Sequence, residues 1–318
     1  MPDDALPTLP LSRQSMADVA SRALERARTH GATDAEVEVS AAVGQSVTVR
    51  QGDVETVEYN RDKGLTLTAY IGGRRGHAST SDLASEAIER TAAAACAIAR
   101  HTAKDAAAGL PDGDRLFRGE PPDLGLLHPW GLTVEEAIEI ARRTEAAAFA
   151  VDGRINNSEG ATVSAQDSDF VLANTRGFLA GFPGSKASIA CGVIAEDARG
   201  MQRDYWYTAH RDPKRLEDAE SVGRRAGERT VRRLGARRVP TAEVPVLFEA
   251  DVAGSLLGHF VSAASGSSLY RRSSFLLDRI GTAVFAPRVD ILEDPHLDRK
   301  STRLNSSHIQ KSRMPSSA

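Results

Sequence analysis

The chain has 318 residues, and its 40 lysine and arginine residues against 43 aspartate and glutamate residues give a formal net charge of −3. Hydrophobic residues make up 41% and charged residues 26% of the chain. These values exclude a disordered, collagen-like or disulfide-stapled protein, and the length predicts two or three domains with real cores. No apolar run is long enough to span a bilayer.

The N-terminal residues and the cysteines both predict a cytoplasmic protein. Residues 1–10 contain Asp3 and Asp4 and no basic residue, which is unlike a signal peptide. Cys96 and Cys191 lie in alanine-rich, apolar stretches, and we expect two buried, reduced thiols. The sequence contains no CxxC pair and no Cys/His cluster with metal-binding spacing.

The first predicted element is an amphipathic helix. We expect Ser15 to cap its N-terminus and Gly31 to end it. Between them, apolar residues recur at helical spacing, which places them on one face. These residues are Met16, Val19, Ala20, Ala23, Leu24 and Ala27.

The apolar period then changes to two, which is typical of strands. Polar and glycine-rich groups at 51–53, 62–64 and 72–73 divide the stretch into short segments, and we expect a turn at each. Short turns between strands predict an antiparallel meander. A second helix follows, with Ser81 as its expected cap. Residues 1–104 are therefore predicted to form an N-terminal α+β domain.

A linker and a second domain are predicted next. Residues 105–132 are rich in glycine and proline, as expected of a linker. Thr133 and Glu136 have the spacing of a capping box, which predicts the start of a helix. Several strands and a long helix at 216–234 follow, and together they predict a central α+β domain over 133–239.

The last predicted domain covers 240–298. We expect a strand at 244–249 and then a helix with a continuous apolar stripe over 252–264. Residues 269–295 have too little apolar content to close a domain. The sequence therefore predicts only the beginning of a β-rich C-terminal domain.

The last helix also carries a polar stripe of Asp251, Ser255, His259 and Ser262. A Ser-His-Asp triad requires the acid to contact the histidine. Asp251 and His259 are two helical turns apart, on the order of 12 Å, so we interpret the stripe as a solvated face.

Other clusters of functional residue types have simpler interpretations. The remaining histidines are scattered and have no partner at metal-ligand spacing, and a lone histidine is seldom a ligand. A run of arginines at 224–238 shares its helix with acidic and apolar residues. We interpret the run as a solvated helix face, with an acidic partner surface as the alternative.

Three parts of the chain carry motifs of one known family. GHASTSDL at 76–83, within the segment that begins at Gly64, resembles the N-terminal domain of the TldD/PmbA metallopeptidase family. NSEG at 157–160 and NTRGF at 174–178 resemble its central domain. PVLF followed by GSLLGHF, over 245–260, resembles the opening of its C-terminal domain.

The resemblance has consequences for the metal site. In that family a TldD-type subunit carries an HExxxH motif, in which two histidines bind zinc and the glutamate acts as base. Here Gly254 and Ser255 stand at the positions of the first histidine and the glutamate, and only His259 is retained. The resemblance therefore implies a PmbA-type (TldE-type) subunit, and we expect no catalytic residue and no metal ligand in this chain. Zinc is expected in a TldD-type partner subunit.

The implied function is a role in proteolysis of unfolded or modified peptides, such as peptide-antibiotic maturation and antitoxin turnover. Activity is expected only in a heterodimer with the TldD-type partner. The alternative is a non-enzymatic binding module that modulates a nucleic-acid enzyme such as DNA gyrase. A third possibility is a metal site completed by residues beyond this sequence.

The segment 299–318 differs from the rest of the chain. It carries five basic residues, no acidic residue and six serines, and without it 35 basic residues face 43 acidic ones, a net charge of −8. It resembles no part of the family, and we expect it to be an artefactual addition to a C-terminally truncated protein. The acidic remainder argues against nucleic acid as the main partner.

Overall fold

The computed structural model describes residues 9–119 and 123–292, except for the side chain of Asp251. The chain divides into two compact units, Met1–Gly235 and Ala236–Ala318. The predicted segment 299–318 lies outside the described residues.

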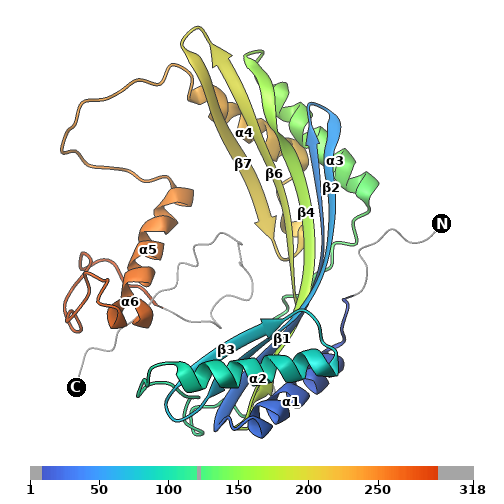
Figure 1. Cartoon of the computed structure of the whole chain (residues 1–318). Helices are drawn as coiled ribbons and strands as arrows, with labels where there is room; N and C mark the ends of the chain where they lie inside the picture. The colour runs from blue at the N-terminus through green and yellow to red at the C-terminus, as the bar shows by residue number, and fades with distance from the viewer. Residues whose placement is uncertain (1–8, 120–122, 293–318) are drawn as a thin grey trace. The chain divides into compact units, whose positions relative to one another are not determined.

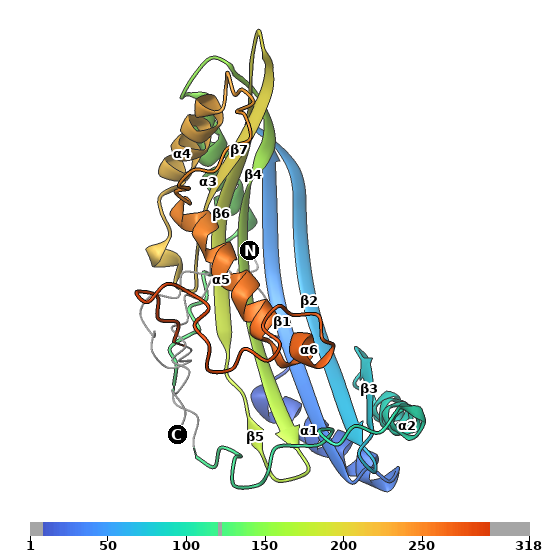
Figure 2. The same cartoon turned by 90° about the vertical axis from the view of Figure 1, so that its left-hand side faces the viewer.

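One antiparallel sheet forms the framework of the first unit (Figure 1). Its strand order is β3-β2-β1-β4-β6-β7, and the short β5 pairs with β4. The strands are β1 (Asp34–Arg50), β2 (Asp53–Tyr70), β3 (Arg75–Thr80), β4 (Ile155–Asn174), β5 (Leu179–Ala180), β6 (Gly184–Asp197) and β7 (Gly200–His210). Figure 2 shows the long strands β1, β2 and β4 running side by side along the unit.

Four α-helices among the described residues of the first unit pack against the sheet. They are α1 (Arg13–Thr29), α2 (Ser85–His101), α3 (Val134–Phe149) and α4 (Ala219–Arg232), and a 3-10 turn, η1 (Pro213–Arg215), precedes α4. The capping box predicted at Thr133 and Glu136 is confirmed at the start of α3. Two other predicted caps are wrong: Ser12 caps α1 in place of Ser15, and α2 begins after Ala84, well past Ser81.

The strands are longer than the sequence pattern indicates. The predicted turn at 62–64 is wrong, because Asp62, Lys63 and Gly64 continue β2 and pair with Ala42, Ala41 and Ser40 of β1. The hairpin turn is at Gln51 and Gly52, whose φ angles are 53° and 81°. A turn at 62–64 would interrupt the pairing with β1. Because β1 continues alongside these residues, they stay in β2.

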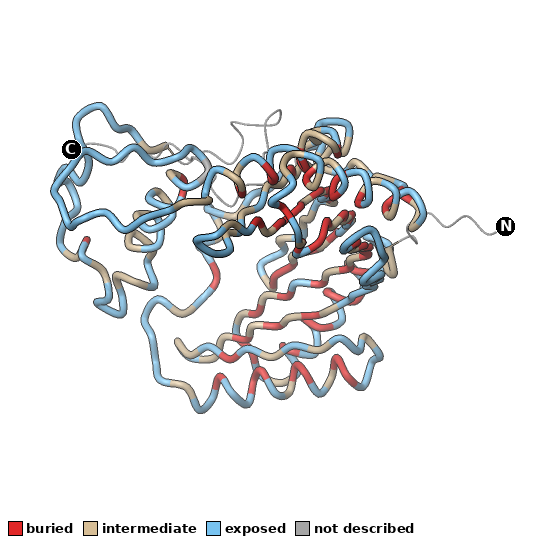
Figure 3. Tube along the Cα trace, turned by 90° about the horizontal axis from the view of Figure 1, so that it is seen from above, coloured by how far each residue is buried: buried red, intermediate tan, exposed pale blue. Residues whose placement is uncertain are grey.

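Two apolar clusters lie on the same face of the sheet. In β1, Val37 and Val39 pack with α1 and α2, whereas Val47 and Val49 pack with α3 and α4. These residues all have odd numbers, and strand side chains alternate between faces, so one face of β1 carries both clusters. Figure 3 shows the resulting alternation of buried and less buried positions along the strands.

The sheet joins the regions that the sequence separates at 105–132. Each region has its own apolar cluster, and β1 and β4 run through both. The α+β class expected from the sequence is confirmed. The individual domain bounds stay a prediction.

The second unit contains α5 (Ala250–Ala264) and α6 (Gly266–Tyr270) within its described residues. The predicted strand at 244–249 is wrong, because this segment has no regular structure. Its apolar side chains are exposed, with Leu247 at 99%, and a strand needs a neighbour to pair with. No helix in the described part of the chain is long and apolar enough to cross a membrane.

Candidate functional site

The second face of the sheet is the main candidate site. Even positions of β1, such as Ser46, direct their side chains away from both apolar clusters. Strand register aligns these positions with residues of β2, β4 and β6. One row contains Asn60, Gly44, Gln166 and Lys186, and the next contains Glu58, Ser46, Ser164 and Ser188.

A pocket of about 640 Å³ lies over these rows. This volume is within the range of small-ligand sites. Its lining is Gly44, Gln45, Ser46, Val57, Glu58, Tyr59, Asn60, Ser164, Ala165 and Gln166. A Cβ at Gly44 would meet the tip of the Asn60 side chain, which would have to move aside.

The rows around the pocket are polar and have small side chains. Hydroxyl groups bond across neighbouring strands, with Thr48 Oγ1 3.0 Å from Thr162 Oγ1 and Ser164 Oγ 2.9 Å from Ser188 Oγ. This arrangement offers hydrogen-bond donors and acceptors. It suits a ligand with its own polar groups, such as a polypeptide backbone.

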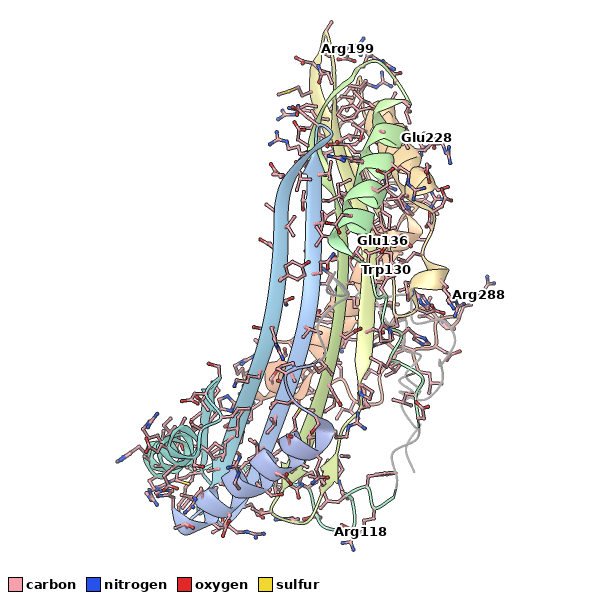
Figure 4. All side chains as sticks on the ribbon, turned by 90° about the vertical axis from the view of Figure 1, so that its right-hand side faces the viewer. Arg118, Trp130, Glu136, Arg199, Glu228 and Arg288 are labelled. Carbon is pink, nitrogen blue, oxygen red and sulfur yellow. The ribbon has the colours of Figure 1, made fainter. Side chains whose placement is uncertain are left out.

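A buried carboxylate holds the hairpin between β1 and β2. Glu145 of α3 is 2% exposed and accepts hydrogen bonds from the backbone nitrogens of Gln51 and Gly52, each at 2.8 Å. The sequence pattern alone did not predict this role of Glu145. One feature of the sequence does indicate burial: Glu145 falls on the apolar face of α3, four residues after Ala141. Figure 4 shows α3 extending along the sheet from the region of Trp130 and Glu136.

The arginine run is partly structural rather than a freely solvated face. The guanidinium groups of Arg225 and Arg229 lie 4.6 and 5.2 Å from the ring centroid of Trp206 on β7. Arg229 and Arg233 are each 3.6 Å from a carboxylate oxygen of Asp204, whose side chain is 12% exposed. These contacts attach α4 to β7 through cation–π and ionic interactions.

The two cysteines are buried, as the sequence predicts. Burial raises the pKa of Cys96, and burial with the nearby carboxylate of Glu145 raises the pKa of Cys191 to about 12. A thiol with such a pKa stays protonated near neutral pH and is a weak nucleophile.

The residues aligned with the zinc motif lie on α5. Gly254 is buried, whereas Ser255 and His259 are exposed. The Ser255 hydroxyl donates to the backbone oxygen of Val252 at 2.7 Å, so it is engaged within its own helix. Of these three positions only His259 offers a metal-binding group, and the set does not fit a zinc site. The described residues contain no group of three or more His, Cys, Asp or Glu side chains that could hold a metal ion.

Comparison with family models gives three matches in chain order. Residues 35–99 match the PmbA/TldA metallopeptidase domain 1. Residues 127–234 match the PmbA/TldA metallopeptidase central domain, and 241–309 match the family's C-terminal domain. The last match extends into the segment 299–318, which was expected to resemble no part of the family.

Curated relatives are similar over most of the chain. The metalloprotease PmbA of Escherichia coli O157:H7 is 42% identical over 90% of this chain and 63% of its own length. The PmbA homolog of Haemophilus influenzae is 39% identical over 95% of this chain and 67% of its own length. The chain therefore spans about two thirds of the length of these relatives.

Solved structures share the fold. A candidate modulator of DNA gyrase from Bacteroides thetaiotaomicron has a TM-score of 0.81 and 25% identity, covering 89% of this chain and 64% of that chain. TldE from Thermococcus kodakarensis has a TM-score of 0.67 and 15% identity, covering 81% of this chain and 58% of that chain, which indicates a shared fold.

Proposed function

This chain belongs to the PmbA/TldD metallopeptidase family, and from that premise we propose that it is a PmbA-type, non-catalytic subunit that works with a zinc-bearing TldD-type partner. The full-length protein would form a heterodimer in the cytoplasm with that partner. The peptide-bond chemistry would take place at the partner's metal.

One observation carries the non-catalytic assignment. The α5 positions that correspond to the family's paired zinc ligand and base hold Gly254 and Ser255. Glycine has no side chain, and a serine hydroxyl cannot replace a glutamate as a general base. His259 alone supplies one ligand, whereas catalytic zinc sites use three protein ligands.

The proposed substrates are unfolded or modified peptides, including peptide antibiotics and antitoxins. The metalloprotease names of the curated relatives support peptides as substrates in general. The polar second face of the sheet supports it as well, because an unfolded peptide presents backbone amide groups that hydroxyl and carboxamide side chains can bind.

Co-expression with a TldD-type subunit tests the proposal. We expect the two chains to co-purify and to degrade an unfolded substrate such as casein, while either chain alone shows little activity. The His259→Ala variant should retain the activity of the complex, whereas replacement of the partner's motif glutamate should abolish it. Failure to bind a TldD-type subunit would contradict the proposal.

A second candidate is modulation of a nucleic-acid enzyme. Its support is the description of the Bacteroides thetaiotaomicron structure as a candidate modulator of DNA gyrase. This function would give a strongly salt-dependent affinity for DNA or for a DNA-bound enzyme. Binding of that kind, without co-purification of a TldD-type subunit, would favour this candidate.

A further inference from the structure

We propose that the second face of the sheet binds a short peptide with both termini free, its ammonium group at Glu58 and Asp62 and its carboxylate at Lys186 and Arg211. The inference rests on the proposed function for the choice of peptides as ligands. The location and the polarity of the site come from the arrangement of charges on this face.

The acidic side of the site is on β2. Glu58 pairs with Ser46 and Asp62 pairs with Ala42, so both carboxylates point to the second face. Both side chains are exposed. Among the described residues neither forms an ion pair, although Asp62 accepts a 3.5 Å hydrogen bond from Asn60. Two uncompensated carboxylates on one strand attract a cation.

The basic side is at β6. Lys186 pairs with Gln166, and its side chain is exposed on the same face. A Cβ at Gly184, two residues earlier, would lie 2.9 Å from Nη1 of Arg211, so this guanidinium occupies the space above the glycine. Within the described part of the chain, neither cation forms an ion pair.

Arg211 shows a second sign of a missing partner. Its Nε is buried and has no hydrogen-bond acceptor among the described residues. Burial lowers the pKa of Arg211. Because this Nε is shielded, a peptide carboxylate would bind the other guanidinium nitrogens, whose parallel N–H groups match its two oxygens.

The separation of the two sides sets the ligand length. Three strand spacings of about 4.8 Å separate β2 from β6, which gives about 14 Å. An extended peptide advances about 3.3 Å per residue, so four or five residues span this distance. Between the two sides, the 640 Å³ pocket and its hydroxyl and carboxamide groups lie along the peptide's path.

Calorimetric titration of the full chain with penta-alanine tests the proposal. We expect the peptide with two free termini to bind, and N-acetylation or C-amidation to weaken binding by roughly threefold to fivefold each. The double variant Glu58→Gln/Asp62→Asn should lose the response to acetylation but keep the response to amidation. Lys186→Gln should reduce the response to amidation, and this exposed change leaves the fold intact.

Controls separate this site from general charge effects. Lys63 lies on β2 but points to the first face, so Lys63→Gln should change none of these affinities. Absence of penta-alanine binding would overturn the proposal, as would blocked peptides that bind as well as the free one. Competition by inorganic phosphate as strong as that of the peptide would also overturn it, because phosphate needs only the basic side. None of these results depends on a TldD-type partner, so they are separate from the test of the proposed function.

Discussion

The contact between Glu145 and the β1–β2 hairpin gives a quantitative prediction. The carboxylate of Glu145 accepts hydrogen bonds from two backbone nitrogens, each at 2.8 Å, and the residue is 2% exposed. Glu145→Gln keeps one acceptor oxygen and turns an NH2 group toward the other donor. Leaving one buried donor unpaired costs about 1–3 kcal/mol, and the lost bond is charge-assisted, so we expect about 2–3 kcal/mol.

Urea unfolding followed by tryptophan fluorescence measures this change. Trp130 and Trp206 are the two tryptophans of the chain, and both belong to the first unit, so the signal reports the unit that contains Glu145. With a slope of about 2–3 kcal/mol/M, the midpoint should fall by about 1 M. The matched control is Glu139→Gln, an exposed change on the same helix, which should shift the midpoint little. An unchanged midpoint for Glu145→Gln, or equal losses for both variants, would refute the reasoning.

Three further predictions concern acid stability, thiol reactivity and apolar exposure. The Arg176 guanidinium holds the pKa of Asp34 below its ordinary value of 3.8, so the stabilisation is present above that value and is lost as the pH falls through the lower folded-state pKa. Unfolding measured between pH 5 and pH 2 should therefore show a shallower acid loss for Asp34→Asn than for the parent chain, and identical profiles would contradict this. Cys96 and Cys191 should resist a thiol reagent in the native chain and both react in denaturant; rapid native labelling would show that burial does not protect them. The exposed apolar side chains of the second unit should bind a hydrophobic dye in the full chain, and no fluorescence gain on mixing would argue against that exposure.

Local sequence signals predicted some elements well. The apolar period of the first helix gave its buried face, and Met16, Ala20 and Ala23 are fully buried there. The capping box at Thr133 also predicted the start of α3. These signals work because helix formation depends on residues within a few positions of one another.

Features that depend on pairing over long distances were not predictable in the same way. The residues Asp62-Lys63-Gly64 have the composition of a turn, but the continuing β1 strand keeps them in β2. The second face combines Asn60 and Gln166, which are more than a hundred positions apart and meet through the register of β1. A single sequence contains no signal for that register across the linker.

The resemblance to the family identified Gly254, Ser255 and His259 as the positions aligned with its zinc motif. The role of Glu145 was harder to recognise. A glutamate on an apolar helix face indicates an unusual partner, but the partner is a hairpin turn whose position depends on tertiary structure. The resemblance to the family therefore gave the metal hypothesis, and tertiary contacts gave the supporting residue.

Metal analysis of this chain, with and without a TldD-type partner, tests the central claim most directly. The account predicts no stoichiometric zinc on the chain purified alone. It predicts about one zinc per heterodimer in the complex, a content that His259→Ala leaves unchanged. Stoichiometric zinc on the isolated chain, lost in His259→Ala, would contradict the assignment of a non-catalytic subunit.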